Sequence, residues 1–290
     1  MENKPTHITL QNFTTCNGAF YVSLNLSFQV FGAPMHTAPI ILINHALTGN
    51  SQVIGESGWW NDIVGVDKTI DVRKYTIVSF DVPGNGFNSA TIEDYRDFIT
   101  RDIARIFIEG LRVLKIDKLF ALIGGSVGGG IAWEILALEP KLAENFIPIA
   151  TDWKATDWLI ANCYLQEQIL NNSSKPIEDA RIHAMLCYRT PESFKVKFNR
   201  DLNEQLETFK VESWLNYHGE KLEKRFQLSA YKMMNQLLKT IDITRNRQSL
   251  EAVISKVEAN IYIVGINSDL FFTAKENRET YNEIKKFKNK

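Results

Sequence analysis

The stretch that most constrains the fold lies at residues 118–135, KLFALIGGSVGGGIAWEI. A nearly continuous apolar run ends in two glycines and Ser126, and a helical pattern follows at once. Short apolar runs of this kind are typical of strands in a parallel sheet that is covered on both faces. The stretch therefore predicts a strand, a tight turn and a helix, which is the repeating unit of an α/β sheet.

Much of the chain repeats this alternation. Residues 20–32 alternate apolar and polar side chains, as a half-buried antiparallel strand does. Apolar runs predict further strands at 39–47, 75–84, 118–125, 145–151 and 259–269, and helical spacing predicts a helix within 91–115. Residues 152–246 carry only helical patterns. We therefore predict an α/β core of residues 1–151 and 247–290, with a mostly parallel sheet and an inserted helical cap of residues 152–246.

The composition excludes several functional classes. The 290 residues carry a net charge of -1, which leaves no basic footprint for nucleic acid or an anionic membrane. No apolar stretch approaches the roughly 20 residues that span a bilayer, and the first residues lack the pattern of a secretory leader. Cys16, Cys163 and Cys187 have neither disulfide-framework nor metal-ligand spacing. We expect a soluble cytoplasmic protein without a metal site.

Ser126 is the candidate nucleophile. Gly124 to Gly128 fit the pattern G-x-S-x-G, in which a sharp turn between strand and helix lifts the serine hydroxyl above the sheet. Residues two before and two after such a serine crowd each other, which explains the glycines. The following helix directs its amide groups and positive dipole end at the hydroxyl. The alternative is an ordinary glycine turn.

A second loop is a candidate for the oxyanion hole. Residues 43–50, INHALTGN, follow an early apolar strand, where α/β-hydrolases place the loop that supplies one oxyanion-hole amide. We predict that the N–H groups of Leu47 and Val127 hold the negative oxygen of a tetrahedral intermediate. Alternatively, His45 and Thr48 only cap a loop.

Asp269 is the candidate acid. It ends the predicted strand 259–269, at the carboxyl edge of the sheet where the site must lie. Its alternative role is to cap the next helix. In this fold a catalytic histidine should follow the acid. We expect either that the last strand and the catalytic-histidine loop lie beyond Lys290, or that the chain is a degenerate relative, because every histidine precedes Asp269: His7, His36, His45, His183 and His218.

Several long segments, in the same order, resemble the homoserine O-acyltransferase family of the α/β-hydrolases. They cover nearly the whole chain and are therefore far more specific than G-x-S-x-G alone. The matching segments are NHALTGNSQV, GWWNDIVGVDKTIDVRKYTIVSFDVPG, IGGSVGGGIAWE, ARIHAMLCYRTPESFKVKFNR, SAYKMMNQLLKTIDI and IVGINSDLFFTAKENRE.

The resemblance implies roles for individual residues. It makes Ser126 the acyl-accepting nucleophile and Asp269 the acid that orients the histidine. Arg181 matches the arginine that binds the homoserine carboxylate, a task suited to a bidentate cation. Tyr188 matches a tyrosine that lines the same pocket. The alternative for Arg181 is a surface ion pair with Glu178.

The resemblance also implies an activity. Family members transfer an acetyl group from acetyl-CoA to L-homoserine in methionine synthesis, hold no cofactor and form homodimers, which we expect here through the helical cap. The chain departs from the family at Gly130-Ile131, where Met-Gln is usual, and in the shorter segment 81–90. These departures leave acetyl- and succinyl-CoA open as donors. The alternative functions are a serine esterase and a non-catalytic binding protein.

Overall fold

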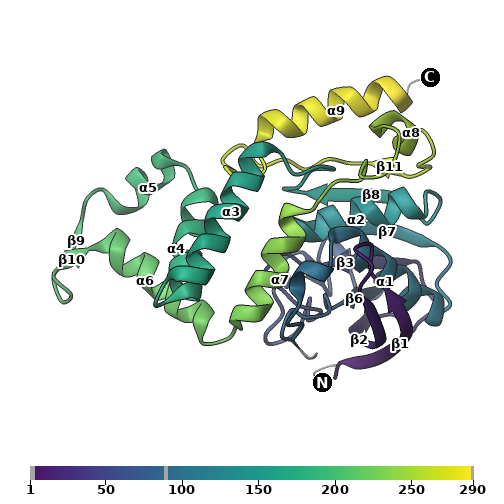
Figure 1. Cartoon of the computed structure of the whole chain (residues 1–290), viewed down its shortest axis with the longest axis horizontal. Helices are drawn as coiled ribbons and strands as arrows, with labels where there is room; N and C mark the ends of the chain where they lie inside the picture. Colours follow the sequence, from purple (N-terminus) through teal and green to yellow (C-terminus); the bar gives the residue numbers. More distant parts are fainter. Residues whose placement is uncertain (1–3, 88–90, 289–290) are drawn as a thin grey trace.

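The computed structural model describes residues 4–87 and 91–288, so the end of the short segment 81–90 lies outside the described residues. A central sheet with helices packed against it forms one side of the molecule, and a group of helices extends away from it (Figure 1). The predicted α/β class with a mostly parallel sheet is confirmed.

The central sheet has the strand order β1-β2-β6-β3-β7-β8-β11. From β6 to β11 the strands are parallel, whereas β1 and β2 are antiparallel to their neighbours, as predicted for residues 20–32. The strands are β1 Thr6–Thr14, β2 Phe20–Gly32, β3 Ile40–Asn44, β6 Thr76–Phe80, β7 Leu119–Gly125, β8 Ala143–Ile149 and β11 Asn260–Ile261.

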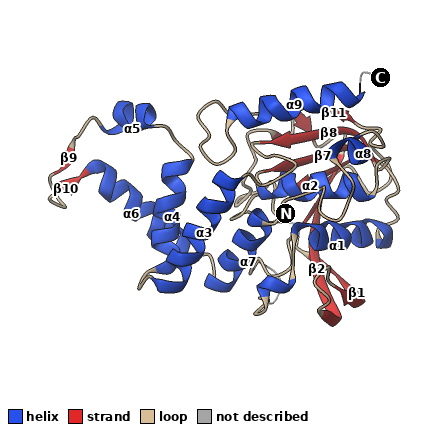
Figure 2. Cartoon of the chain, turned by 45° about the horizontal axis from the view of Figure 1, so that its top comes forward, coloured by secondary structure: helices blue, strands red, loops and turns tan. Residues whose placement is uncertain are grey.

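Both faces of the sheet are covered, which explains the apolar runs. In β3, Leu42 packs into the core under the helices, and Ile41 and Ile43 pack into a second core on the opposite face. Helices α1, Thr100–Val113, and α2, Val127–Leu138, cover the first face (Figure 2). The second core includes apolar residues from the segment between β3 and β6, which contains the short strands β4, Val64–Gly65, and β5, Ile70–Asp71.

The last predicted strand is much shorter than expected. Only Asn260–Ile261 is regular, although the backbone beyond it stays beside β8: Tyr262 N donates to Phe146 O at 2.8 Å and Val264 N to Pro148 O at 2.9 Å. The bond that the parallel ladder requires between these two would come from the amide of Pro148. Proline has no N–H, and the ladder is therefore interrupted there.

Residues 152–246 are mainly helical, as predicted. A short hairpin of β9, Leu202–Asn203, and β10, Thr208–Phe209, is a correction, because this region was predicted to lack strands. The helices are α3 Asp157–Asn172, α4 Pro176–Cys187, α5 Pro191–Phe198, α6 Lys210–Glu223 and α7 Leu228–Lys239.

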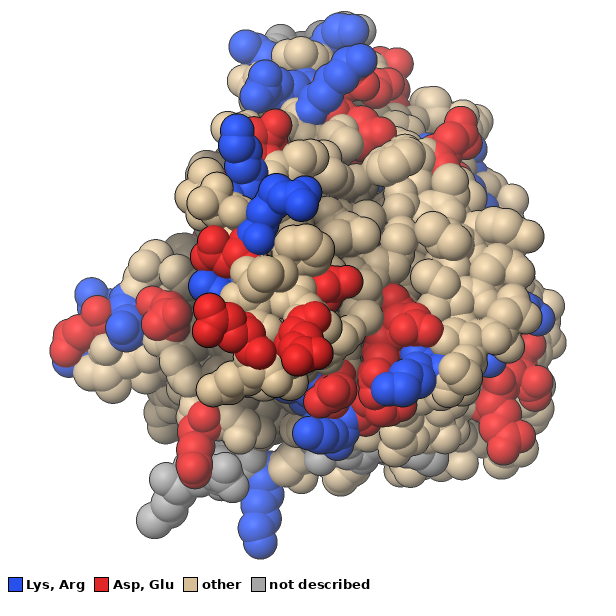
Figure 3. Space-filling model, turned by 90° about the vertical axis from the view of Figure 1, so that its left-hand side faces the viewer, with Lys and Arg blue, Asp and Glu red and all other residues tan. Residues whose placement is uncertain are grey.

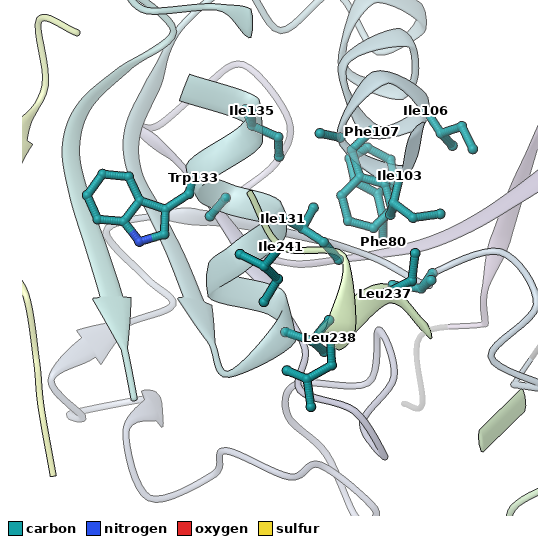
Figure 4. Close-up of a cluster of buried hydrophobic side chains, with 14 of the residues drawn as sticks. Phe80, Ile103, Ile106, Phe107, Ile131, Trp133, Ile135, Leu237, Leu238 and Ile241 are labelled. Atoms are coloured by element: carbon teal, nitrogen blue, oxygen red, sulfur yellow. The ribbon is translucent and has the colours of Figure 1, made fainter. Parts of the chain in front are cut away.

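This helical region is not a detached layer. Leu237 and Leu238 of α7, and Ile241 after it, are buried in the same core as Ile131 of α2 (Figure 4). The tip of the region, α5 with the β9–β10 hairpin and α6, lies farthest from the sheet (Figure 1). The division into core and cap at residues 151/152 and 246/247 stays a prediction.

Three further helices complete the described chain: η1 Tyr95–Asp97, α8 Leu250–Ile254 and α9 Ala274–Lys288. The helix predicted within 91–115 is thus η1 followed by α1. None of the helices in the described ranges has the length and apolar character needed to cross a membrane.

Candidate active site

Ser126 occupies a strained turn between β7 and α2. Its φ of 53° and ψ of -125° are unusual for a residue with a side chain. A Cβ on Gly124 would lie 2.7 Å from the Gly129 nitrogen and closer still to the Gly128 carbonyl. The prediction that crowding around the serine requires glycine is therefore confirmed at Gly124 and Gly128, while the nucleophile role of Ser126 stays a prediction.

The serine backbone is fixed while its hydroxyl is free. Ser126 N donates to Ile149 O at 2.9 Å, and Gly129 N donates to Ser126 O at 2.9 Å. Within the described residues, the Ser126 hydroxyl has no hydrogen-bond partner, and neither does the Val127 N–H. Val127 is the first residue of α2, where amides have no acceptor within the helix. An available hydroxyl therefore lies next to an available amide.

The predicted oxyanion loop is a tight turn over the start of α2. Gly49 N donates to Ala46 O at 2.9 Å, which places Leu47 and Thr48 at the corner. The Leu47 N–H makes no hydrogen bond in the part of the chain that the structure describes. Leu47 lines the same cavity as Ser126, and Val127 follows Ser126 directly, so these two amides stay the predicted oxyanion-hole donors.

Asp269 lies in a turn that is tied to the helical region. Its Oδ1 accepts the N–H groups of Phe271 at 2.7 Å and Phe272 at 3.1 Å. Partial burial raises the pKa of the Asp269 carboxyl, and these two hydrogen bonds act against the increase. The helix-capping alternative is wrong, because Thr273 and Glu276 bond to each other's amides at the start of α9.

Arg181 and Tyr188 approach the same space from α4. The Arg181 guanidinium lies 5.6 Å from the centre of the Tyr188 ring. Among the described residues, no carboxylate lies within 4.0 Å of Arg181. Glu178, its alternative partner, instead binds Lys175 at 3.0 Å. Arg181 therefore has no carboxylate partner in the described part of the chain, and it lines a cavity.

One cavity of about 300 Å³ brings the predicted residues together, although they span more than 200 positions in sequence. Val127 is not among the residues that line it, and its side chain is buried. The catalytic and binding roles of these residues stay predictions. The cavity is lined by Ala46, Leu47, Thr48, Ser126, Ala150, Arg181, Tyr188, Ile266, Asp269, Phe271 and Phe272.

None of the described residues that line this cavity is a histidine. His45 is buried behind the oxyanion turn, His183 lies 2.9 Å from the Gln166 amide through Nδ1, and His218 packs its ring on Trp214. His7 and His36 are exposed. The cavity lining thus includes a serine hydroxyl, the Leu47 backbone, a carboxylate and a guanidinium.

Sequence reasoning missed three contributors. Arg225, between α6 and α7, donates to the Thr48 carbonyl at 3.0 Å and so connects the helical region to the oxyanion turn. Leu270 fixes the acid turn: its N–H donates to Cys187 O at 3.0 Å and its carbonyl accepts from Trp158 Nε1. Asp81, buried at the end of β6, binds Ser51 beyond the turn. Their partners are remote in sequence, so no local pattern reveals them.

Comparisons with known proteins agree with this geometry. A family model described as alpha/beta hydrolase fold matches residues 39–285. A homoserine O-acetyltransferase from Chloroherpeton thalassium is 34% identical over 265 residues, covering 82% of this chain and 69% of that protein. A crystal structure of homoserine O-acetyltransferase from Staphylococcus aureus matches with a TM-score of 0.83 and 27% identity, over 96% of this chain and 84% of the other.

A crystal structure of esterase E22 has a TM-score of 0.85 over 99% of this chain and 91% of the other, but only 16% identity, and so shares the fold alone. The family model matches most of the chain, and a homoserine O-acetyltransferase is 34% identical to it. The chain therefore belongs to the α/β-hydrolase fold family and, within it, to the homoserine O-acetyltransferase family of enzymes.

Proposed function

We propose that the protein transfers an acetyl group from acetyl-CoA to the hydroxyl of L-homoserine through an ester on Ser126. The observation that carries the proposal is the unpaired Arg181 in the same cavity as Ser126. A plain esterase needs no cation there, whereas an amino-acid acceptor offers a carboxylate for it. The names of the related enzymes supply the reaction.

In the first half-reaction, the Ser126 oxygen attacks the thioester carbonyl and gives its proton to a base. The negative oxygen of the tetrahedral intermediate accepts hydrogen bonds from the Leu47 and Val127 amides. The carbon–sulfur bond then breaks, and CoA leaves as the thiol after taking the proton from the base. Ser126 now carries the acetyl ester.

In the second half-reaction, homoserine binds with its carboxylate on Arg181, and Tyr188 lines the site. The homoserine hydroxyl gives its proton to the base and attacks the acetyl ester. The same two amides hold the intermediate, and Ser126 takes the proton from the base as O-acetylhomoserine leaves. A cavity of about 300 Å³ is at the small end for ligand sites, which suits a small amino acid. Asp269 orients the base.

We also propose that the protein is a cytoplasmic enzyme of methionine synthesis and that it holds no bound cofactor. In this proposal two copies form a homodimer through the helical cap. The tip of that region exposes Val196 by 86%, Leu202 by 59% and Leu206 by 60%. Figure 3 looks onto this side and shows non-ionic surface between the charged groups. Sedimentation of the protein should give a dimer, and Val196→Asp should weaken it.

The test of the reaction follows the release of free CoA thiol from acetyl-CoA, with and without L-homoserine. The 290-residue chain is assayed in imidazole buffer, since imidazole can supply a base, beside a form extended through the family's histidine segment. Homoserine-dependent release that is abolished in Ser126→Ala supports the transfer. Equal release without homoserine contradicts it. Succinyl-CoA, run in parallel, identifies the preferred donor.

Arg181 has a separate prediction. Arg181→Ala should raise the KM for homoserine by about 10- to 100-fold with little change in the KM for acetyl-CoA, because it removes charge-assisted hydrogen bonds to the acceptor. Arg189→Ala is the matched control, since Arg189 lies over the Trp214 ring and outside the cavity lining. If Arg181→Ala raised the KM for both substrates equally, Arg181 would not be the residue that binds the homoserine carboxylate.

A serine esterase is the second candidate, and the fold shared with esterase E22 is its support. Rapid hydrolysis of p-nitrophenyl acetate without any transfer to homoserine would favour it. In that case Arg181→Ala should leave the hydrolysis unchanged.

A further inference from the structure

A cluster of buried polar side chains lies behind the oxyanion turn. His45 begins the turn, Ser51 follows it, and Asp81 lies at the end of the neighbouring strand β6. Each is exposed by no more than 1%. Burying polar groups is costly unless they are hydrogen-bonded, so the cluster needs a structural or functional reason.

Both ring nitrogens of His45 are occupied. Nδ1 lies 2.8 Å from the Ala46 carbonyl, which can only accept, so Nδ1 carries a proton. Nε2 lies 3.1 Å from the Val82 amide, which can only donate, so Nε2 is the acceptor. The Asn85 amide nitrogen, 3.4 Å from Nε2, can act as a second donor to the same lone pair. These partners fix a neutral imidazole with its hydrogen on Nδ1.

The surroundings keep the ring neutral. Burial lowers the pKa of His45, and the Asp81 carboxylate acts in the opposite direction. That carboxylate is itself bound: it accepts the Ser51 N–H at 2.6 Å and the Ser27 hydroxyl at 2.6 Å. If Nε2 were protonated, its N–H would point at the Val82 N–H. Two hydrogen-bond donors would then face each other without an acceptor, which is unfavourable.

The turn is held at its other end by the same strand. Asp81 receives both the amide and the hydroxyl of Ser51, and the Ser51 hydroxyl also lies 2.9 Å from Gln29 Oε1. Residues 81 and 82 therefore bind the chain just before and just after the turn. On the α2 side, Asn44 Nδ2 donates to Gly128 O at 3.2 Å.

These contacts determine where the Leu47 amide lies. Leu47 comes two residues after His45, and the carbonyl between them, that of Ala46, accepts from the His45 ring and from Gly49 N. A rotation of the peptide planes that redirects the Leu47 N–H would break at least one of these bonds. A misplaced oxyanion donor costs about 100- to 1000-fold in rate.

We propose that His45 is a positioning residue: as a neutral imidazole with its hydrogen on Nδ1, it fastens the oxyanion turn to the end of β6 and so holds the Leu47 N–H toward Ser126. It touches no substrate and transfers no proton. The role rests on Leu47 serving as an oxyanion donor in the proposed acyl transfer, but the state of the ring can be tested without any activity.

The first experiment reads the ring directly. Nitrogen-15 NMR of histidine-labelled protein at pH 7 should show a protonated Nδ1 and an unprotonated Nε2 for His45, and no titration of this ring near the ordinary histidine pKa of about 6.5. His7, which is exposed, is the internal reference. An Nε2-protonated or a positively charged ring at pH 7 would overturn the proposal.

The second experiment separates the two bonds by substitution. In His45→Gln the side-chain oxygen can accept from the Val82 amide, as Nε2 does. In His45→Asn the side-chain amide can donate only to the Ala46 carbonyl. His45→Phe keeps the ring shape and loses both bonds. The rate of Ser126 acetylation is read as the p-nitrophenolate burst from p-nitrophenyl acetate in imidazole buffer. His45→Phe should slow it about 100-fold without changing the half-saturating ester concentration, with His45→Gln and His45→Asn in between. His7→Gln is the control.

Outcomes for the positioning role and for the acyl transfer are distinguishable. A folded His45→Phe that is acetylated at the wild-type rate overturns the positioning role and leaves acyl transfer intact. If wild-type Ser126 is not acetylated, the proposed function fails. The positioning role of His45 is then tested by the NMR resonance of the Leu47 amide. That resonance should stay in place in His7→Gln and move in His45→Phe; an unmoved resonance in His45→Phe overturns the role.

Discussion

The two sides of the cavity are built by different means. The nucleophile side, residues 44–51 and 124–130, is held by contacts between backbone atoms around glycines and by buried polar bonds. The acid side, residues 262–280, is held by a few backbone bonds to β8 and to Cys187 and by side-chain bonds, and it remains more open. Tyr262 is exposed by 54% and Ile266 by 45%.

This contrast follows from what each side must do. A serine in a strained conformation persists only where its neighbours leave it no alternative, so the nucleophile side requires tight packing. A carboxylate that orients a base needs a defined turn and a partly dry environment, which side chains from the cap can provide. We therefore expect steric changes to matter most on the first side and polar changes on the second.

The largest effect is expected from Gly128→Ala. The added Cβ would lie 2.6 Å from the Asn44 carbonyl and closer still to that of His45, and backbone atoms cannot move aside cheaply. Unfolding free energy should fall by about 3 kcal/mol, and acyl transfer about 100-fold or more. Gly125→Ala is the control, since beyond the chain neighbours of Gly125 no heavy atom of the described residues lies within 4 Å of the added Cβ. Similar losses in both variants, by denaturation and thiol release, would contradict the steric account.

On the acid side, Asp152 makes stability depend on pH. It accepts the Thr280 hydroxyl of α9 at 2.7 Å, and burial raises its pKa to about 6. The folded state therefore keeps this proton at a pH where the unfolded chain, with a pKa of about 3.9, has lost it. Stability contributed here is fully present below about pH 4 and is lost as the pH rises through about 6.

Asp152→Asn should remove this dependence. Between pH 4 and pH 7 the unfolding free energy of the variant should rise by about 2 kcal/mol relative to that of the unsubstituted protein. Thr280→Val, which keeps the carboxylate and removes one donor, should retain the dependence. Denaturant titrations at several pH values measure this dependence. If the unfolding free energies of Asp152→Asn and of the unsubstituted protein change with pH in the same way, Asp152 is not the group that causes the dependence.

The smallest effect is expected from Trp158→Phe, which removes the donor to the Leu270 carbonyl in the acid turn. Loss of one hydrogen bond of about 1 kcal/mol should slow acyl transfer roughly fivefold. Trp59→Phe removes a comparable bond, Nε1 to Asn50 O at 2.9 Å, next to the nucleophile side. Because buried contacts already hold that side, Trp59→Phe should change the rate less. A larger loss there than in Trp158→Phe would reverse the comparison.

Much of the fold was predictable because its signals are local. The antiparallel strand 20–32 was predicted with its observed bounds. The strand predicted at 259–269 was too long because its hydrogen bonds depend on Pro148, in another strand. The β9–β10 hairpin was missed because two-residue strands carry no periodicity.

The sequence by itself determined the α/β class, the glycine turn at Ser126 and the candidate residues, since spacing and side-chain size act between neighbours along the chain. Only the tertiary structure decided that Arg181 has no carboxylate partner among the described residues, that Asp269 binds amides in its own turn, and that His45 is locked between Ala46 and Val82. Such bonds join segments far apart in sequence, and their geometry exists only once the sheet has brought those segments together.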